Sequence, residues 1–220
     1  MDLREALYTT RSMRRLKPDP VPLDVQARIL DAARFAPSGR NMQNWHFILV
    51  DDPQIAKVLG PIYREQIGAV LDSTYAEAAR AAANDPDSPE SRALERLFRS
   101  VRHQALHWES IPLFLFAYAP EGNTGSSIFP AIWSAMLAAR AEGVGSTLTT
   151  VLNPRKDVDR LLGVPEDEGW VQVACVPMGY PTGRFGVPER KPLASVAGRN
   201  SWSGPLGFDA SEPLWPGDEL

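Results

Sequence analysis

The sequence predicts a protein of mixed helices and strands, in either the α/β or the α+β class, folded as one domain. Four short apolar or β-branched runs of strand length are separated by longer segments of helical periodicity. The chain of 220 residues can bury one sizeable core, and its composition of 44% hydrophobic and 23% charged residues is that of an ordinary globular protein. The formal net charge of −4 gives no general electrostatic reason to bind nucleic acid or an anionic membrane.

The first segment of the chain predicts two helices and a strand. The apolar spacing of residues 3–7 indicates a short first helix. A second helix follows Pro22 and should end at Pro37, because proline cannot continue a helix. Residues 45–50 are a continuous apolar run, which predicts a strand buried on both faces.

The middle of the chain predicts long helices and a second strand. Residues 55–83 have a helical composition that ends at the Asp- and Pro-rich segment 84–89, and residues 90–108 predict a further polar helix. Residues 113–118 predict the second buried strand. Residues 128–141 are apolar almost all round, so we expect a central helix buried on most sides.

The last third predicts two more strands and a tail. Residues 146–151 are β-branched and predict a third strand, and residues 171–176 predict the fourth. Between them a short helix should begin at Asn153-Pro154, with asparagine as N-cap. Residues 201–220 combine aromatic residues with proline and glycine. Such a tail is either disordered or laid across another surface, and its aromatic residues favour the second.

Cysteine usage and the apolar runs exclude several classes of protein. Cys175 is the only cysteine, which excludes an intrachain disulfide and a multi-thiolate metal site. Its apolar neighbours predict a buried, unreactive thiol. No run approaches the roughly 18 apolar residues that span a bilayer, and the first five residues lack an apolar signal core. We therefore expect a soluble, cytoplasmic protein.

A basic motif lies between the first two predicted helices, at residues 10–15. It offers three guanidinium groups and two hydroxyls in the six residues Thr-Arg-Ser-Met-Arg-Arg. Guanidinium forks and hydroxyl donors match a phosphate monoester. A solvated basic linker would have the same local sequence, so both interpretations stay open.

A second motif, residues 36–45, comes after the second predicted helix. Gly39 permits backbone geometries that other residues resist, and the amides of Asn41 and Gln43 suit the hydrogen-bonding edge of a planar ring. The alternative is an Asx-type turn before a strand, with Trp45 as the first core residue. A ligand that is anionic at one end and ring-shaped at the other would use both motifs, and flavin mononucleotide (FMN) is such a ligand.

Two later segments fit the same ligand. A threonine hydroxyl or a backbone N–H from residues 145–150 can donate to a ring nitrogen, unless these hydroxyls are satisfied within the protein. Arg184, Arg190 and Lys191 form a late basic cluster, which suits either a phosphate or solvent.

Other catalytic chemistries are poorly supplied. His103 and His107 have i, i+4 spacing on a polar helix, but Glu109 is the only nearby carboxylate and no zincin pattern surrounds them. We therefore expect no metal site. The sequence has no nucleophile elbow, no dinucleotide-binding glycine motif after a strand and no P-loop. A redox enzyme of this sequence would need a bound redox cofactor.

Taken in order, these segments resemble the FMN-dependent nitroreductase family of NAD(P)H-dependent flavin oxidoreductases. The resemblance covers nearly the whole chain and depends on several short segments in register. These are residues 11–14, 20–22, 29–33, 36–39, 41–45, 143–146, 177–181 and 190–193. The resemblance implies an α+β fold with a central mixed sheet of four to five strands flanked by helices. It also implies a homodimer that binds FMN at the subunit interface.

The resemblance further implies a domain layout and a set of FMN contacts. One FMN-binding domain would cover residues 1–200, with residues 61–108 as the family's variable helical lid and residues 201–220 as a long C-terminal extension. Residues 11–14 match the motif that holds the phosphate, the ribityl chain and the pyrimidine edge, and residues 37–39 match a turn that approaches the flavin from the partner subunit. The implied cofactor-binding residues are Arg11, Ser12, Met13, Arg14, Pro37, Ser38, Gly39, Asn41, Gln43, Thr147, Leu148, Thr149, Thr150, Arg190 and Lys191.

The activity implied by the resemblance is a ping-pong oxidoreduction. NADH or NADPH would reduce the flavin at N5, near Thr149 or Thr150, and a small electron-poor acceptor such as a nitroaromatic, a quinone or an enone would then take the electrons. Alternatives within the family are a reductive dehalogenase, a flavin-fragmenting enzyme and a natural-product dehydrogenase. Outside this class, the chain would be a non-catalytic flavin-binding protein or an interaction module that uses its aromatic tail.

Three positions depart from the family pattern. Thr10 stands where many members have a second arginine, and Asn44 replaces a frequent proline. Arg40 replaces a frequent small residue. It either adds a cation at the active-site rim, which would favour an anionic substrate, or is an ordinary surface arginine.

Overall fold

A computed structural model describes residues 1–122, 125–153 and 155–209 of the chain. They divide into two compact units. The larger unit is Ser12–Gly183, and the smaller combines Met1–Arg11 with the described residues from Arg184 onward. The larger unit carries the sheet and most of the helices.

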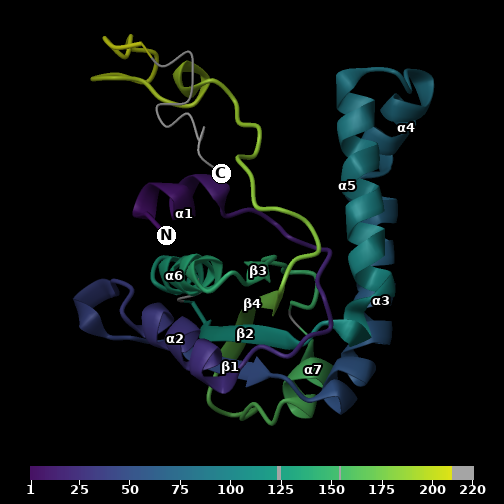
Figure 1. The fold of residues 1–220 in the computed structure, drawn as a ribbon, viewed down its shortest axis with the longest axis vertical. Coiled ribbons are helices and arrows are strands. Elements are labelled where there is room, and N and C mark those ends of the chain that lie inside the picture. Colours follow the sequence, from purple (N-terminus) through teal and green to yellow (C-terminus); the bar gives the residue numbers. More distant parts are fainter. Residues whose placement is uncertain (123–124, 154, 210–220) are drawn as a thin grey trace. The chain divides into compact units, whose positions relative to one another are not determined.

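A four-stranded sheet is the centre of the larger unit. Its strands are β1 (His46–Val50), β2 (Leu113–Pro120), β3 (Gly145–Ser146) and β4 (Trp170–Gly179), in the spatial order β1-β2-β4-β3 (Figure 1). All three pairings between neighbouring strands are antiparallel, and an isolated parallel bridge joins Ser12 to Ser146. The predicted α+β fold with a four-stranded sheet is therefore confirmed, while the expected mixture of strand directions is reduced to that bridge.

Two helices pack against one face of this sheet. α2 (Leu23–Arg34) and α6 (Ile128–Ala141) lie side by side and bury their apolar residues against β2 and β4 (Figure 1). Ile29, fully buried, is at the centre of the apolar stripe that the helical period places on one side of α2. α6 has the predicted bounds, but Phe129 and Trp133 are 40% and 39% exposed, so one side of this helix is open.

The opposite face is covered by α3 (Pro53–Ser73), α5 (Pro89–Leu106) and α7 (Lys156–Leu161). Trp108, directly after α5, is fully buried and stacks on Tyr63 of α3 with ring centroids 3.7 Å apart. Burial of two large aromatic side chains at one point stabilises this junction. The two long helices therefore pack against each other and against the sheet through the same buried aromatic pair.

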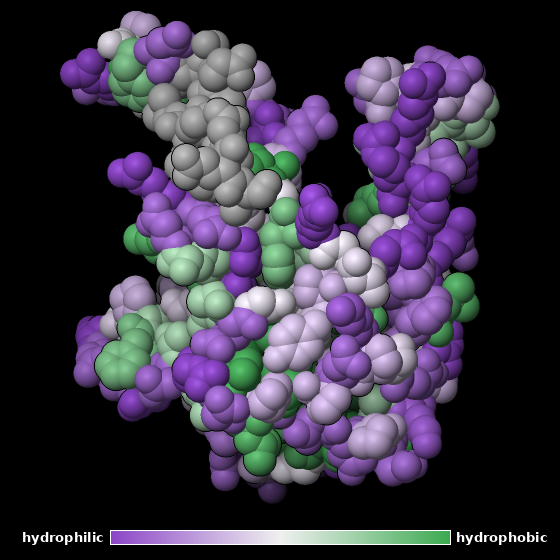
Figure 2. Space-filling view, in the orientation of Figure 1, coloured by the Kyte–Doolittle hydropathy of each residue, from purple (hydrophilic) through white to green (hydrophobic). Residues whose placement is uncertain are grey.

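Beyond the sheet, α3 and α5 run side by side, and α4 (Ala76–Asn84) lies at their far end (Figure 1). The predicted helix over residues 55–83 is thus two helices, which turn at residues 74–75. Ser88 begins α5 as its N-cap, since its hydroxyl accepts a hydrogen bond from the Ser91 N–H at 3.2 Å. The surface of this helical extension is mainly hydrophilic on the face shown in Figure 2.

The two outer strands differ from their predictions. β1 is an edge strand whose residues 46–49 are exposed or only partly buried, so the apolar run 45–50 is not enclosed on both faces. The predicted strand 146–151 is reduced to the two residues of β3. After Ser146 the chain still runs along β4, but pairs with it through an isolated bridge between Thr149 and Cys175.

The predicted helix start at Asn153-Pro154 is also wrong in its position. α7 begins at Lys156, after Arg155 as N-cap. The Asn153 side-chain amide donates to the Val173 carbonyl, so it ties the loop to β4 and does not cap a helix. Pro154 lies outside the described residues.

The smaller unit begins with α1 (Leu3–Thr9), which starts where predicted and is capped by the Asp2 carboxylate. Apart from a short 3-10 turn at Leu193–Ser195, its described residues after 183 form no regular helix or strand. Trp202 is fully exposed, and the rest of the predicted tail from residue 210 onward lies outside the described residues. No described helix of either unit is long and apolar enough to cross a membrane.

Candidate functional site

The segment of residues 12–17, which contains part of the basic motif, is held along the β3 edge of the sheet. The Met13 N–H donates to the Ser146 carbonyl at 2.9 Å, and the Met13 carbonyl accepts from the Thr147 hydroxyl at 3.0 Å. The Met13 side chain is buried. Backbone hydrogen bonds therefore fix the position of the neighbouring Ser12 and Arg14, and the segment is not a free basic linker.

The close approach of this segment to β3 requires glycine at position 145. A Cβ atom built on Gly145 would lie 2.9 Å from the Cβ of Met13 and 3.4 Å from the Cβ of Pro181. Carbon atoms in contact are ordinarily about 3.5–4.0 Å apart. A side chain at position 145 would push residue 13 away from the sheet, so Gly145 does more than terminate the preceding helix.

Arg14 is the most distinctive cation of the site. Its side chain is half-buried, and burial lowers the pKa of its guanidinium, while the Tyr63 and Tyr75 phenols act in the opposite direction. Within the described part of the chain, Arg14 has no hydrogen bond or ion pair. A desolvated guanidinium without a protein anion is a ready partner for a ligand anion.

Arg15 is engaged elsewhere. Its guanidinium Nη1 donates to Nδ1 of His103 on α5 at 3.1 Å. Burial, Arg15 and His107 together lower the pKa of His103, which favours the neutral imidazole that can accept this hydrogen bond. Of the three arginines in the motif, Arg15 therefore connects the segment to the helical extension.

Two buried residues are absent from the sequence prediction: Tyr63, which interacts with Arg14, and Gln104, which is bonded to Tyr63. Tyr63 on α3 is 2% exposed, and burial raises the pKa of its phenol to about 12, although Arg14 and the Thr149 hydroxyl lower it. Its hydroxyl donates to Oε1 of Gln104 on α5 at 3.4 Å. Both are separated by many residues from the motifs, and no local sequence pattern distinguishes them from ordinary core residues.

In the threonine-rich segment, some hydroxyls form hydrogen bonds within the protein and one is exposed. Thr147 is buried, and its hydroxyl is used by the Met13 carbonyl. The Thr149 hydroxyl accepts from the Val151 N–H at 3.3 Å, and its backbone exchanges two hydrogen bonds with Cys175. Leu148 packs against the core on the α2–α6 side. Thr150 is exposed, and no described residue pairs with its hydroxyl.

The second motif forms a tight turn before β1. Arg40, Asn41 and Gln43 all have left-handed backbone angles, with φ of 55°, 54° and 51°. Such angles cost energy for residues other than glycine and asparagine, and they cluster at functional sites. The Ser38 hydroxyl stabilises the turn by accepting from the Gln43 N–H at 3.1 Å. The motif is thus a turn before a strand, as in the alternative interpretation, but the side chain that stabilises its backbone is Ser38 and not an Asx residue, and exposed amides remain on its surface.

The two amides of this turn bond to each other. The Gln43 Nε2 donates to Asn41 Oδ1 at 3.2 Å, and both side chains are exposed. The Gly39 N–H donates to the Ser127 hydroxyl at 3.3 Å, which ties the turn to the residue before α6. The predicted residues Pro37, Ser38, Gly39, Asn41 and Gln43 are therefore on one turn at the surface of the larger unit.

Three predicted phosphate ligands belong to the smaller unit. Arg11 is exposed and donates to the Arg184 carbonyl at 3.4 Å. Arg190 is exposed and donates to the Glu189 carbonyl at 3.0 Å, and Lys191 is also exposed. None of their side chains forms an ion pair within the described residues, so these cations are available to a ligand.

The described residues offer little support for other chemistries. They contain no group of three metal-ligating side chains. His103 and His107 stack on each other with centroids 4.1 Å apart. Cys175 is fully buried in β4, so the prediction of a buried thiol is confirmed, and burial raises the pKa of this thiol well above the usual range.

Comparison with known proteins identifies the family. The family model described as nitroreductase matches residues 7–180, which is most of the chain. This chain belongs to the nitroreductase family. The 5,6-dimethylbenzimidazole synthase of Rhodobacter capsulatus is similar to this family member, with 29% identity over 213 residues that cover 91% of this chain and 90% of that protein.

Two solved structures share this fold. Oxidized iodotyrosine deiodinase bound to FMN and 3-iodo-L-tyrosine superposes with a TM-score of 0.67 at 20% identity, covering 91% of this chain and 99% of that one. The FMN-dependent nitroreductase NfnB from Mycobacterium smegmatis, in complex with NADPH, gives a TM-score of 0.63 at 22% identity, covering 91% and 100%.

Two departures from the nitroreductase pattern have structural consequences. The Thr10 hydroxyl donates to the Ala6 carbonyl at 2.6 Å, so it completes the end of α1 where many family members have an arginine. Arg40 lines a hollow of about 210 Å³ together with Ser38, Ser126 and Ser127. No carboxylate lines this hollow, and no described residue pairs with the Arg40 guanidinium.

Proposed function

We propose that this chain is an FMN-dependent oxidoreductase that takes electrons from NADH or NADPH and passes them to a small electron-poor acceptor by a ping-pong mechanism. The observation that carries this proposal is the half-buried Arg14 guanidinium, which has no protein anion among the described residues and lies on a segment fixed beside Gly145. Membership of the nitroreductase family and the FMN present in a structure of the same fold support the choice of ligand.

The donor set fits the two ends of FMN. Arg14 and Ser12 would bind the phosphate or ribityl end, because a guanidinium and a hydroxyl match its oxygens. Met13, between them, would hold the segment in place through its buried side chain. Among the predicted threonines, Thr150 has an exposed hydroxyl free for the ring, whereas the Thr147 hydroxyl is already used. We also propose Arg11, Arg190 and Lys191 as phosphate ligands, as the family resemblance implies.

Bound FMN would supply hydride acceptance and donation at N5. The chain itself would bind and orient the ring and keep an electropositive environment around it. Backbone N–H groups and arginines stabilise negative charge that develops on a bound group. No side chain is assigned as a proton donor. We propose residues 1–200 as the FMN-binding domain, residues 61–108 as its lid and residues 201–220 as an extension.

We also propose a cytoplasmic homodimer with FMN at the subunit interface. Large apolar side chains are exposed on α6 and next to the turn, where Phe129, Trp133 and Met42 are 40%, 39% and 55% exposed. Exposed apolar side chains that gather on a surface mark interaction sites. The turn of residues 37–39 would approach FMN of the partner subunit.

A specialised reaction is the second candidate. The similarity to a 5,6-dimethylbenzimidazole synthase extends over 91% of this chain, which favours a flavin-fragmenting enzyme among the alternatives. A fold shared with iodotyrosine deiodinase keeps reductive dehalogenation open. These reactions would use the same cofactor site and differ from a general reductase in the step that comes after reduction of the flavin.

The absorption spectrum of the purified protein tests the cofactor, and anaerobic reduction tests the reaction. We expect oxidised-flavin bands, bleaching by NADH or NADPH, and recovery on adding a quinone. Loss of FMN in air with formation of a new aromatic product would support the fragmenting enzyme, and failure to bleach would support a non-catalytic flavin protein. A colourless protein that does not take up added FMN contradicts the proposal.

Arg14→Gln tests the carrying observation directly. The dissociation constant of FMN should rise by about 10- to 150-fold, because hydrogen bonds to charged groups contribute about 1.5–3 kcal/mol. Arg64→Gln is the matched control, because the Arg64 guanidinium already has a protein anion. It forms an ion pair with the Glu109 carboxylate, with an N–O distance of 2.7 Å. Equal loss of FMN affinity in both variants would show that the effect is not specific to Arg14.

A further inference from the structure

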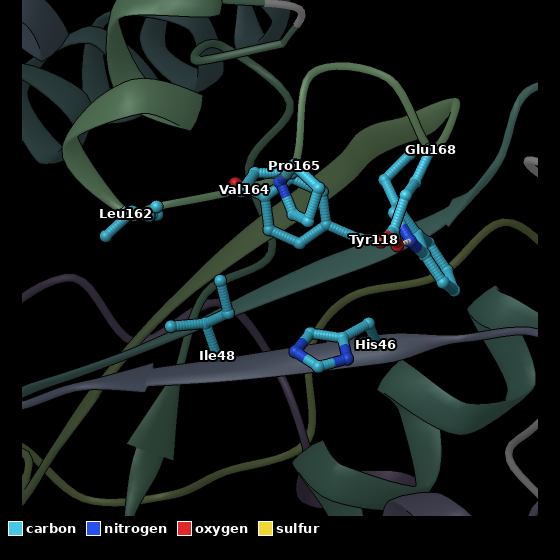
Figure 3. A pocket seen from close by; sticks show the side chains of 9 residues that line it. His46, Ile48, Tyr118, Leu162, Val164, Pro165 and Glu168 are labelled. Carbon is cyan, nitrogen blue, oxygen red and sulfur yellow. Dashed lines mark hydrogen bonds between the residues drawn. The ribbon is translucent and has the colours of Figure 1, made fainter.

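One pocket of the larger unit lies at the other end of the sheet from Gly145. It has a volume of about 350 Å³, near the lower end of the roughly 300–1,000 Å³ typical of small-ligand sites. His46 at the start of β1 and Tyr118 near the end of β2 are paired residues on adjacent strands, and Trp170 begins β4. The segment after α7 closes the pocket, with Leu162 and Val164 opposite His46 (Figure 3).

Aromatic rings form one wall of this pocket. The rings of His46 and Trp170 are 6.0 Å apart and inclined by 56°, and the buried Tyr118 ring lies between the strands and the loop (Figure 3). Tyr118 is held in place because its hydroxyl donates to Asp159 Oδ1 at 3.1 Å. The electron-rich faces of indole and phenol rings attract cations.

Among the described residues, the pocket is lined by a negatively charged side chain and by no lysine or arginine. Glu168 supplies this carboxylate at the edge of the pocket. The Trp170 indole N–H donates to Glu168 Oε2 at 3.1 Å, which holds the carboxylate beside the indole. The other carboxylate oxygen has no partner among the described residues. The pocket thus combines a carboxylate beside aromatic rings with the aliphatic side chains of Leu162 and Val164. This combination complements a ligand that has a positively charged group on an apolar body.

We propose that this pocket binds a small organic cation, either a protonated amine or a quaternary ammonium carried on an aryl or alkyl body. The charged group would lie between Glu168 and the face of Trp170, and the apolar body would contact Leu162 and Val164. This site does not depend on FMN, since none of its residues belongs to the candidate cofactor site.

The test uses benzyltrimethylammonium chloride as probe and the full-length purified protein with its bound cofactor. Its permanent charge removes any effect of ligand titration. The indole N–H resonance of Trp170 is monitored by NMR at constant ionic strength. We expect a saturable shift with a dissociation constant of about 1–10 mM, the scale for a ligand of this size. Benzoate and benzyl alcohol should produce no saturable shift.

Two variants separate charge from aromatic contact. Glu168→Gln keeps an acceptor for the indole N–H but removes the charge, and binding should weaken about two- to fivefold. Trp170→Leu, monitored from the ligand signals, should weaken it by about the same factor. Glu77→Gln makes the same charge change on an exposed part of α4 and should leave binding unchanged.

Three results would overturn the proposal. They are no saturation at about ten times the expected concentration, equal binding of benzoate or benzyl alcohol, and unchanged affinity in Glu168→Gln. Glu168 is exposed, so its replacement tests the site even if Trp170→Leu fails to fold.

Discussion

Replacing Gly145 by alanine tests whether the position of the basic motif controls cofactor affinity. The added Cβ would lie 2.9 Å from the Cβ of Met13, and a Cβ atom cannot rotate away because it is bonded to the backbone. Relief to an ordinary contact of about 3.5–4.0 Å requires a shift of about 0.6–1.1 Å. The segment with Ser12 and Arg14 must move with Met13.

The structure gives the magnitude of this effect. A shift of that size lengthens the two hydrogen bonds of Met13, which are 2.9 and 3.0 Å long, beyond hydrogen-bonding range. Each such bond contributes about 0.5–1.5 kcal/mol net. Binding of FMN must restore the displaced segment, so its free energy should weaken by about 1–3 kcal/mol, and the dissociation constant should rise about 5- to 150-fold.

The assay is titration of the apoprotein with FMN, measured by quenching of flavin fluorescence, together with thermal unfolding. Gly68→Ala is the matched control, because Gly68 lies within α3 and its added Cβ meets nothing within 4 Å. That variant should keep wild-type affinity and equal or higher stability, since alanine favours helix. Wild-type FMN affinity and stability in Gly145→Ala would refute the link between the close approach and cofactor binding.

Two further predictions concern charge. Arg40→Ala should raise the KM for 4-nitrobenzoate about two- to fivefold relative to neutral 4-nitrobenzamide, as expected for loss of one exposed ion pair; an unchanged ratio would make Arg40 an ordinary surface residue. Burial raises the pKa of Asp159 above 3.8 in the folded protein. Protonation of this carboxyl therefore stabilises the folded state below that pH, and the stabilisation is lost as pH rises through the folded-state pKa. Asp159→Asn should therefore have a higher Tm than wild type at pH 7, with the difference disappearing below about pH 3.8. Equal melting temperatures across this range would contradict it.

Hydrophobic period predicted most of the helices and strands, but not the break between α3 and α4, the shortness of β3 or the start of α7. α6 has its predicted bounds because an apolar run of 14 residues before a glycine has one plausible structure. β1 shows the limit of this reasoning. The apolar run predicts a strand, but the burial of that strand depends on the elements that lie next to it. Residues 45–50 do not encode which elements these are, and β1 is at the edge of the sheet.

The candidate site was predictable in its motifs and not in its pairings. The basic motif indicated Arg14, but the exclusion of a solvated linker required the backbone bonds of Met13, whose partner is 133 residues further along the chain. The sequence alone did not show which of Thr147, Thr149 and Thr150 has a hydroxyl free to bind the cofactor. Only the tertiary structure shows that the Thr147 hydroxyl is used internally while Thr150 is exposed.

The helical extension reaches the candidate cofactor site through its buried base. Tyr63 of α3 lies where its phenol interacts with Arg14 and Thr149, and its hydroxyl donates to Gln104 of α5. Trp108 stacks on the same ring, so the ring cannot move without disturbing the core on that face. Under the proposal that residues 61–108 form the lid, a change at Tyr63 should alter how Arg14 is held, whereas a change in α4, at the far end of the extension, should leave the contacts of Tyr63 intact.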